Sequence, residues 1–173
     1  VQSTSLFPVC PIQDRAPNNT LFNIPAGNVT INHQDPSNTY GWDNEYGHHQ
    51  ADINAFKAAC FLTSNQEYLE LMEAGGYDKA EFWNEEGNQW RTYTASQQPT
   101  FWVNKGSEKD PLWYLRCMTE EIPMPWNWPV EVNQLEAHAF CQWKSQKEGV
   151  SIRLPSEDEY LRLRDHSQAL NYQ

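Results

Sequence analysis

Residues 63–77 read TSNQEYLELMEAGGY, and they carry the clearest fold signal in the chain. Ser64 and Glu67 have the spacing of a capping box, in which the serine hydroxyl accepts a hydrogen bond from an amide of the first helical turn and the glutamate reaches back. Apolar residues follow, and Gly75-Gly76 provides the left-handed stop that ends many helices. The stretch therefore predicts a helix over residues 65–74.

Two further helix starts lie downstream of this stretch. Asn133 and Glu136 repeat the capping pattern, and the apolar residues behind them recur at helical spacing, which predicts a helix to about residue 146. A capping box at Ser156 predicts a last helix that ends near residue 165.

The remaining segments are rich in turn residues and in prolines that break helices. Their strand content is low for a chain with so many aromatic residues, so we expect an incomplete domain in residues 21–173. The expected elements are a linker or extended arm in 1–20, a strand pair around Gly27 in 21–31, a polar surface loop in 32–50, a strand in 55–61, one or two short helices broken at Gly87 in 80–91, and irregular structure with short strands in 95–130.

Length and composition narrow the class of protein. The chain has 173 residues, which suits one domain, and its 8 Trp, 8 Tyr and 7 Phe are enough large rings to build a core. A formal net charge of -11 argues against nucleic acid and anionic membranes as partners. No apolar run approaches the roughly 18 residues of a membrane span, and the start does not resemble a signal peptide. We therefore expect a cytoplasmic protein.

The four cysteines, Cys10, Cys60, Cys117 and Cys141, are widely spaced and form no C-x-x-C pair. This spacing argues against zinc and thioredoxin-like sites. Two disulfides are arithmetically possible, but nothing else indicates secretion, so we expect reduced thiols.

Two adjacent histidines are the most visible metal candidates. His48 and His49 follow Asp43 and Glu45, and imidazole with carboxylate suits iron or zinc. Adjacent residues of a strand point to opposite sides, however, so one ion cannot easily recruit both histidines. We favour a structural or surface role for them.

Several segments together resemble the formylglycine-generating-enzyme (sulfatase-modifying factor) domain. They are FNIPAGNVTI at 22–31, GWDNEYGH at 41–48, the helix stretch at 63–77, PVEVN at 129–133 and RLPSEDEY at 153–160. Two more, FWNEEG at 82–87 and EIPMPWNWPV at 121–130, are similar to the sulfoxide synthases of ergothioneine and ovothiol synthesis, above all to 5-histidylcysteine sulfoxide synthase.

The resemblance implies a loop-rich α+β fold, a variant of the C-type lectin fold, present here as its N-terminal half. It also implies a non-heme enzyme that uses Fe(II) and oxygen to join cysteine to histidine as a sulfoxide. In such enzymes a preceding DinB-like domain holds the iron, and a methyltransferase domain often follows. The His-x-x-x-His-x-Glu pattern of that iron site is absent from this sequence. We therefore expect no catalytic or metal-binding residue in this chain.

Trp126 and Trp128 are the substrate-binding candidates. They flank Asn127 between prolines and suit a substrate pocket or the interface to the iron domain, with burial in the core as the alternative. Two other functions stay open: a lectin-like binding module, and a formylglycine-generating enzyme, which needs a cysteine pair that cannot be placed on this chain.

Overall fold

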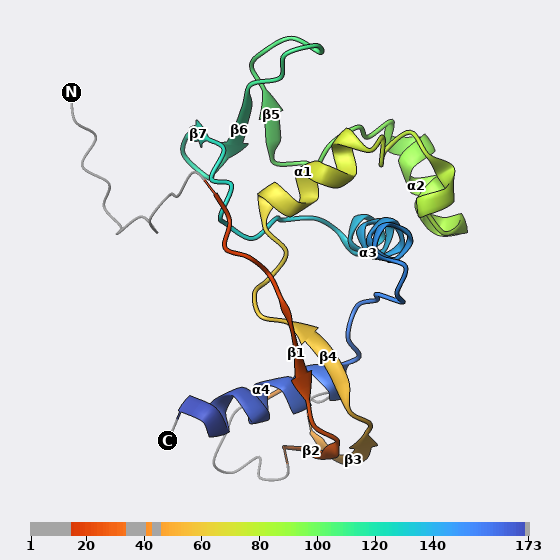
Figure 1. Ribbon diagram of the computed structural model, residues 1–173, viewed down its shortest axis with the longest axis vertical. Coiled ribbons are helices and arrows are strands. Elements are labelled where there is room, and N and C mark those ends of the chain that lie inside the picture. The colour runs from red at the N-terminus through yellow and green to blue at the C-terminus, as the bar shows by residue number, and fades with distance from the viewer. Residues whose placement is uncertain (1–14, 34–40, 43–45, 172–173) are drawn as a thin grey trace, which may run out of the picture. The chain divides into compact units, whose positions relative to one another are not determined.

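The computed structural model describes residues 15–33, 41–42 and 46–171 (Figure 1). The chain divides into two compact units. Unit 1 contains residues 61–154 together with 15–19, and unit 2 contains the described residues of 20–60 and 155–171.

Unit 1 combines helices with a small antiparallel sheet of strand order β5-β6-β7. Its elements are α1 (Asn65–Glu73), the 3-10 helix η2 (Ala80–Phe82), α2 (Glu85–Thr94), β5 (Trp102–Asn104), β6 (Trp113–Arg116), β7 (Glu121–Pro123) and α3 (Gln134–Glu148).

The helix starts of unit 1 follow the predicted caps. The Ser64 side chain accepts a hydrogen bond from the Glu67 amide, and the Glu67 side chain accepts one from the Ser64 amide. Asn133 and Glu136 form the same reciprocal pair at the start of α3. These capping boxes confirm the predictions, because each satisfies amides that have no partner inside the helix.

Aromatic rings fill the core of unit 1. Trp102 is only 2% exposed and makes edge-to-face contacts with Tyr68, Trp113 and Trp126. Phe140 stacks on Tyr68 with ring centroids 5.7 Å apart. The aromatic content therefore does provide the core, as the composition indicated.

Two ion pairs join α1 to α3. Lys144 Nζ lies 3.2 Å from Glu67 Oε1, and Lys147 Nζ lies 2.5 Å from Glu70 Oε2. Both pairs connect residues that are three apart on each helix, so they form a two-rung ladder along one side of the helix pair.

The glycine pair after α1 is required by geometry. Gly75 has φ of +76°, the left-handed conformation that favours glycine. At Gly76, an added Cβ would lie 2.5 Å from the Leu71 side chain and 2.7 Å from the Leu71 carbonyl oxygen. The motif therefore needs glycine at 75 for its backbone angle and at 76 for space.

Replacing Gly76 by alanine is expected to destabilise the chain by about 2 kcal/mol, since the new methyl group overlaps backbone as well as a buried side chain. Urea unfolding measures the change. The control is Glu108→Ala, a substitution at an exposed loop residue. A Gly76→Ala loss below about 0.5 kcal/mol would contradict the steric account.

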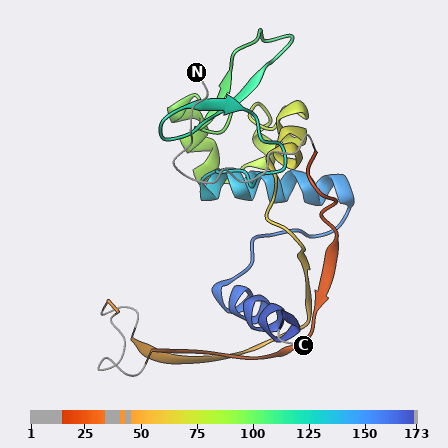
Figure 2. The same ribbon diagram turned by 90° about the vertical axis from the view of Figure 1, so that its left-hand side faces the viewer.

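Unit 2 is a long antiparallel ribbon covered on one side by a helix (Figures 1 and 2). Its elements are β1 (Leu21–Ile24), β2 (Gly27–His33), β3 (Gly47–Ile53), β4 (Phe56–Ala59) and α4 (Glu157–Asn171). β1 pairs with β4 and β2 pairs with β3, in one continuous register.

Arg162 of α4 occupies the interruption between the two pairings. Its Nε donates to the Pro25 carbonyl at 3.0 Å, and its Nη2 donates to the Ala26 carbonyl at 3.3 Å. A Cβ on Gly27 would lie 2.7 Å from the Arg162 guanidinium, so this glycine leaves room for the arginine. Ile24 of β1 and Val29 of β2 are buried apolar side chains of unit 2.

Four predicted details were wrong. The strands within 21–31 do not pair with each other, because each finds its partner on the returning chain. Part of the predicted polar loop, Gly47–Gln50, belongs to β3, whose polar side chains are exposed on a ribbon. Gly87 does not break α2, because the Asn84 side chain caps the Gly87 amide. The last helix continues past residue 165 to Asn171.

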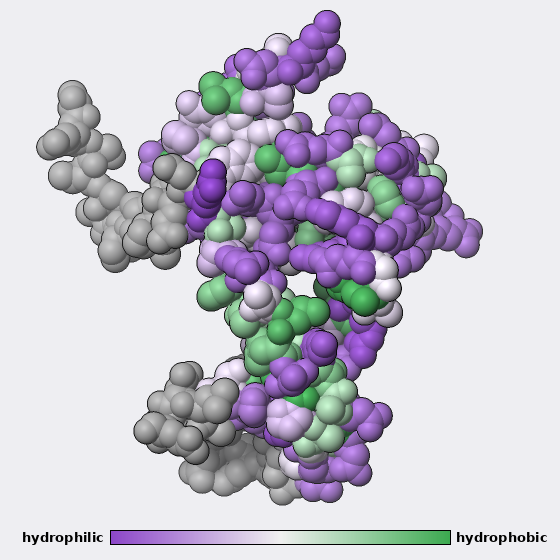
Figure 3. Space-filling model, in the orientation of Figure 1, coloured by the Kyte–Doolittle hydropathy of each residue, from purple (hydrophilic) through white to green (hydrophobic). Residues whose placement is uncertain are grey.

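Among the described residues, no helix is both long enough and apolar enough to cross a membrane. On the face drawn in Figure 3, hydrophilic residues cover most of the surface, in keeping with the net charge of -11.

Candidate functional site

A tight turn formed by Pro125–Trp128 lies against the N-terminus of α1. The Trp128 amide donates to the Pro125 carbonyl at 3.0 Å, which closes the turn. The carbonyls of Trp126 and Trp128 accept hydrogen bonds from the amides of Gln66 and Asn65, at 3.1 and 2.8 Å. The first amides of a helix have no partner within it, so the turn supplies acceptors that α1 needs.

The chain on either side holds the turn in place. The Val130 amide donates to the Thr63 carbonyl at 2.9 Å, and Ser64 and Pro129 form an isolated β-bridge. Pro125 is fully buried. The proline-rich sequence therefore folds here into a fixed turn rather than a free loop.

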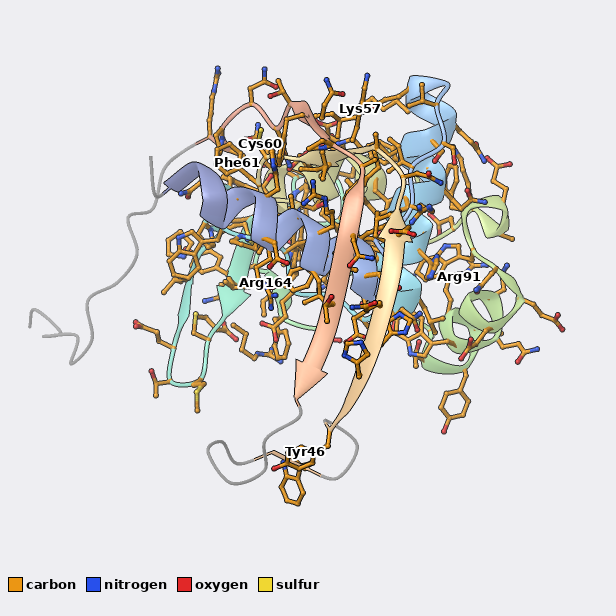
Figure 4. All side chains as sticks on the ribbon, turned by 90° about the horizontal axis from the view of Figure 1, so that it is seen from below. Tyr46, Lys57, Cys60, Phe61, Arg91 and Arg164 are labelled. Carbon is orange, nitrogen blue, oxygen red and sulfur yellow. The ribbon has the colours of Figure 1, made fainter. Side chains whose placement is uncertain are left out.

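A hollow of about 320 Å³ opens beside this turn. It is lined by Pro17, Asn19, Phe61, Leu62, Ser64, Glu67, Asn127 and Pro129. Phe61 and Leu62 are 53% and 74% exposed, so an apolar surface meets polar groups at this place (Figure 4 labels Phe61). A volume near 300 Å³ is at the small end of ligand sites.

The polar wall of the hollow is ordered by Asn19. Its Nδ2 donates to the Phe61 carbonyl at 3.1 Å and lies 3.3 Å from each Glu67 carboxylate oxygen, while its Oδ1 accepts from the Phe61 amide at 3.0 Å. Burial raises the pKa of Glu67, but hydrogen bonds from Ser64 and Asn19 and the charge of Lys144 outweigh it, so the pKa is lowered. Glu67 therefore presents a carboxylate at neutral pH.

The two candidate tryptophans, Trp126 and Trp128, flank Asn127 in the sequence. Trp126 is half-buried and packs on Trp102, with ring centroids 5.9 Å apart. Trp128 is half-buried, and its Nε1 is buried without a hydrogen-bond partner in the described part of the chain. Asn127 lines the hollow. Neither tryptophan is among the residues that line the hollow, so their role in substrate binding stays a prediction.

Sequence reasoning missed Asn127, Asn19 and Asn65 as members of this region. The position of Asn65 at the start of a predicted helix was a usable signal. The first amides of a helix need acceptors from elsewhere in the chain, and a buried asparagine side chain can also donate to a neighbouring carbonyl. No local pattern indicated that Asn19 would meet α1, since they are distant in sequence.

Comparison with known proteins supplies the family. The sulfatase-modifying factor enzyme 1-like domain (FGE-sulfatase) matches residues 7–162. This chain belongs to the sulfatase-modifying factor family. The match confirms the predicted resemblance and the loop-rich α+β fold that goes with it.

The chain is also similar to proteins named hercynine oxygenase. It is 30% identical to that of Mycobacterium tuberculosis over 119 residues, 68% of this chain and 25% of that protein. It is 28% identical to that of Mycolicibacterium smegmatis over 138 residues, 79% of this chain and 29% of that protein. This sulfatase-modifying factor chain therefore spans about a quarter of the length of the curated relatives it matches.

The two histidines that were candidates for a metal site, His48 and His49, lie in β3. His48 and His49 are both exposed, and His49 Nε2 lies 3.3 Å from Asp158 Oδ1. Asp43 and Glu45, the other two members of the candidate set, lie outside the described residues. Within 15–33, 41–42 and 46–171, no three His, Cys, Asp or Glu side chains are grouped so as to hold a metal ion.

The described cysteines, Cys60, Cys117 and Cys141, form no disulfide with one another, and Cys10 lies outside the described residues. Burial raises the pKa of the Cys141 thiol, although Lys144 opposes the shift. A buried thiol of raised pKa is a poor nucleophile, which supports a packing role.

A second hollow, of about 310 Å³, lies over α1 and α3 and shares Asn19 and Glu67 with the first. Its two lysines, Lys144 and Lys147, are already paired with glutamates of α1. Its charged groups therefore connect the helices.

Proposed function

We propose that this chain is the substrate-side part of a non-heme, Fe(II)- and oxygen-dependent sulfoxide synthase that joins cysteine to histidine. The similarity to proteins named hercynine oxygenase over 68–79% of the chain carries the proposal at the level of an iron-dependent oxygenase. The EIPMPWNWPV segment supports the finer assignment, because it resembles the ovothiol enzyme and forms the turn beside the hollow.

The reaction balances without any other oxidant. Cysteine loses its S–H hydrogen and histidine loses a ring C–H hydrogen, a C–S bond forms, one oxygen atom of O₂ goes to sulfur, and the other leaves as water. Iron supplies oxygen activation when bound. The His-x-x-x-His-x-Glu pattern of the resembled iron site is absent from this sequence, and for this reason we place the iron ligands outside this chain, in a DinB-like domain of the same polypeptide.

Within this scheme the turn and the hollow contribute recognition. The exposed side chains of Phe61 and Leu62 offer apolar contact on one side of the hollow, and Glu67, held by Ser64, Asn19 and Lys144, keeps the other side polar. Asn127 adds a side-chain amide that can donate and accept. Apolar surface with a few placed polar groups is the usual composition of a small-molecule site. A methyltransferase domain downstream and a cytoplasmic location complete the proposal.

Identifying the product distinguishes an enzyme that couples cysteine to histidine from one that couples cysteine to hercynine. The complete polypeptide is supplied with Fe(II), oxygen, cysteine and equal amounts of histidine and hercynine, and the products are identified by mass spectrometry. Coupling to histidine supports the ovothiol-type assignment. Coupling to hercynine alone would contradict it and leave an ergothioneine-type enzyme.

Replacing Trp128 by leucine in the complete polypeptide is expected to raise the KM for cysteine or histidine by about tenfold, because the turn loses the half-buried ring next to Asn127 and no longer holds Asn127 at the hollow. We expect kcat to stay within about twofold, since Trp128 is assigned to binding. Steady-state kinetics test this, with Tyr93→Leu as the control, since Tyr93 is 91% exposed. Equal KM values for the two variants would remove Trp128 from the site.

A further inference from the structure

One buried residue, Asn65, contacts both ends of the turn that contains Asn127. The Asn65 amide donates to the Trp128 carbonyl at 2.8 Å, and its Nδ2 donates to the Pro125 carbonyl at 2.9 Å. The same Pro125 carbonyl accepts the amide of Trp128. Asn65 therefore holds the first and the last residue of the turn at once.

We propose that Asn65 is a positioning residue for substrate binding, which acts by fixing the shape of the Pro125–Trp128 turn. What binds beside the turn rests on the proposed function, whereas the contacts of Asn65 do not. Because both ends of the turn are held, the backbone of Asn127 is fixed in the conformation in which this residue lines the hollow.

The side chain of Asn65 has a role that its backbone does not provide. Any residue would offer the amide that binds the Trp128 carbonyl, but only a side-chain donor reaches Pro125. Asn65 is fully buried, and its Oδ1 has no hydrogen-bond partner in the described part of the chain. The donor end of the carboxamide is therefore the end that acts on the turn.

The change Asn65→Asp isolates this contact. Aspartate has nearly the same shape, so no cavity is made, but it replaces the donor with an acceptor that faces the Pro125 carbonyl. The matched control is Asn133→Asp, at the start of α3, where the side-chain oxygen accepts from the Glu136 amide and aspartate can do the same.

The shape of the turn is measured first, on the 173-residue chain. We expect Asn65→Asp to shift the indole N–H resonances of Trp126 and Trp128 in a ¹⁵N-correlated NMR spectrum, assigned by single Trp→Phe variants. Asn133→Asp should leave both resonances in place. Unchanged indole resonances in Asn65→Asp would overturn the proposal, because the side chain would then not set the turn.

Kinetics of the complete polypeptide then test the link to substrate. We expect Asn65→Asp to raise KM about fivefold, the equivalent of one hydrogen bond, with a smaller change in kcat, and to add nothing further in a Trp128→Leu background. A KM equal to that of Asn133→Asp, or effects that add in the double variant, would overturn the positioning role while the proposed function stands. Failure of the wild-type polypeptide to form any sulfoxide would overturn both.

Discussion

Replacing Trp102 by alanine lowers the free energy of unfolding by an expected 3–5 kcal/mol, roughly the cost of removing a large buried ring. Trp102 is 2% exposed, and its ring contacts those of Tyr68, Trp113 and Trp126. Removing it leaves a cavity at the point where α1, the β5-β6-β7 sheet and the turn meet, so the loss is shared by several elements.

Urea unfolding followed by circular dichroism measures this loss. The matched control is Tyr93→Ala, which also removes an aromatic ring but from a position 91% exposed, and it is expected to change stability by less than about 0.5 kcal/mol. Similar midpoints for the two variants would mean that Trp102 is not the centre of the core.

Replacing Glu136 by alanine is expected to cost about 3 kcal/mol, because the buried Tyr77 hydroxyl and the Asn133 amide both lose their acceptor. Glu136 is 1% exposed; its Oε1 accepts from the Tyr77 hydroxyl at 2.5 Å, and its Oε2 accepts from the Asn133 amide at 2.9 Å. The variant therefore loses a helix cap and leaves the Tyr77 hydroxyl with only Tyr68, 3.3 Å away. Glu108→Ala, on an exposed loop, is the control.

The role of Glu136 can also be tested by measuring how the free energy of unfolding changes with pH. Burial raises the pKa of Glu136, against the opposing effects of its hydrogen bonds from Tyr77 and Asn133. A carboxyl whose pKa is higher in the folded than in the unfolded chain favours folding at low pH, and this contribution falls as the pH rises from the unfolded value of 4.5 through the folded one. Glu136→Gln should remove that fall; an unchanged profile would contradict the assignment.

The pH dependence that Glu67 gives to the free energy of unfolding is opposite to that of Glu136. Its pKa is lowered, so its stabilising contribution is present above the unfolded value of 4.5 and is lost as the pH falls through the folded pKa. The Glu136→Gln comparison is therefore made against the wild-type profile, in which the Glu67 contribution is the same.

Local signals in the sequence predicted the parts of the fold that depend on near neighbours. The capping boxes at Ser64 and Asn133 each satisfy helix amides with a residue three positions away, so the pattern contains the whole interaction. The glycine pair after α1 is similar, because its backbone angle and its contact with Leu71 are set within one turn.

Long-range pairing could not be predicted in the same way. The strand β1 finds β4 across more than thirty residues, and nothing local distinguishes that partner from β2. The site has the same limit: Trp126 and Trp128 stood out by composition, but the hollow depends on Asn19 and Phe61, which only the folded chain brings to the turn. The extension of α4 to Asn171 also exceeds its local signals.

Oxygen consumption with product analysis tests the central claim most directly. The complete polypeptide and the 173-residue chain are each loaded anaerobically with Fe(II), mixed with cysteine and histidine, and exposed to oxygen. The account predicts that the complete polypeptide consumes oxygen and forms the histidine–cysteine sulfoxide, and that the chain alone binds no stoichiometric iron and forms none. Sulfoxide formation by the chain alone, or its absence with the iron-loaded complete polypeptide, would contradict it.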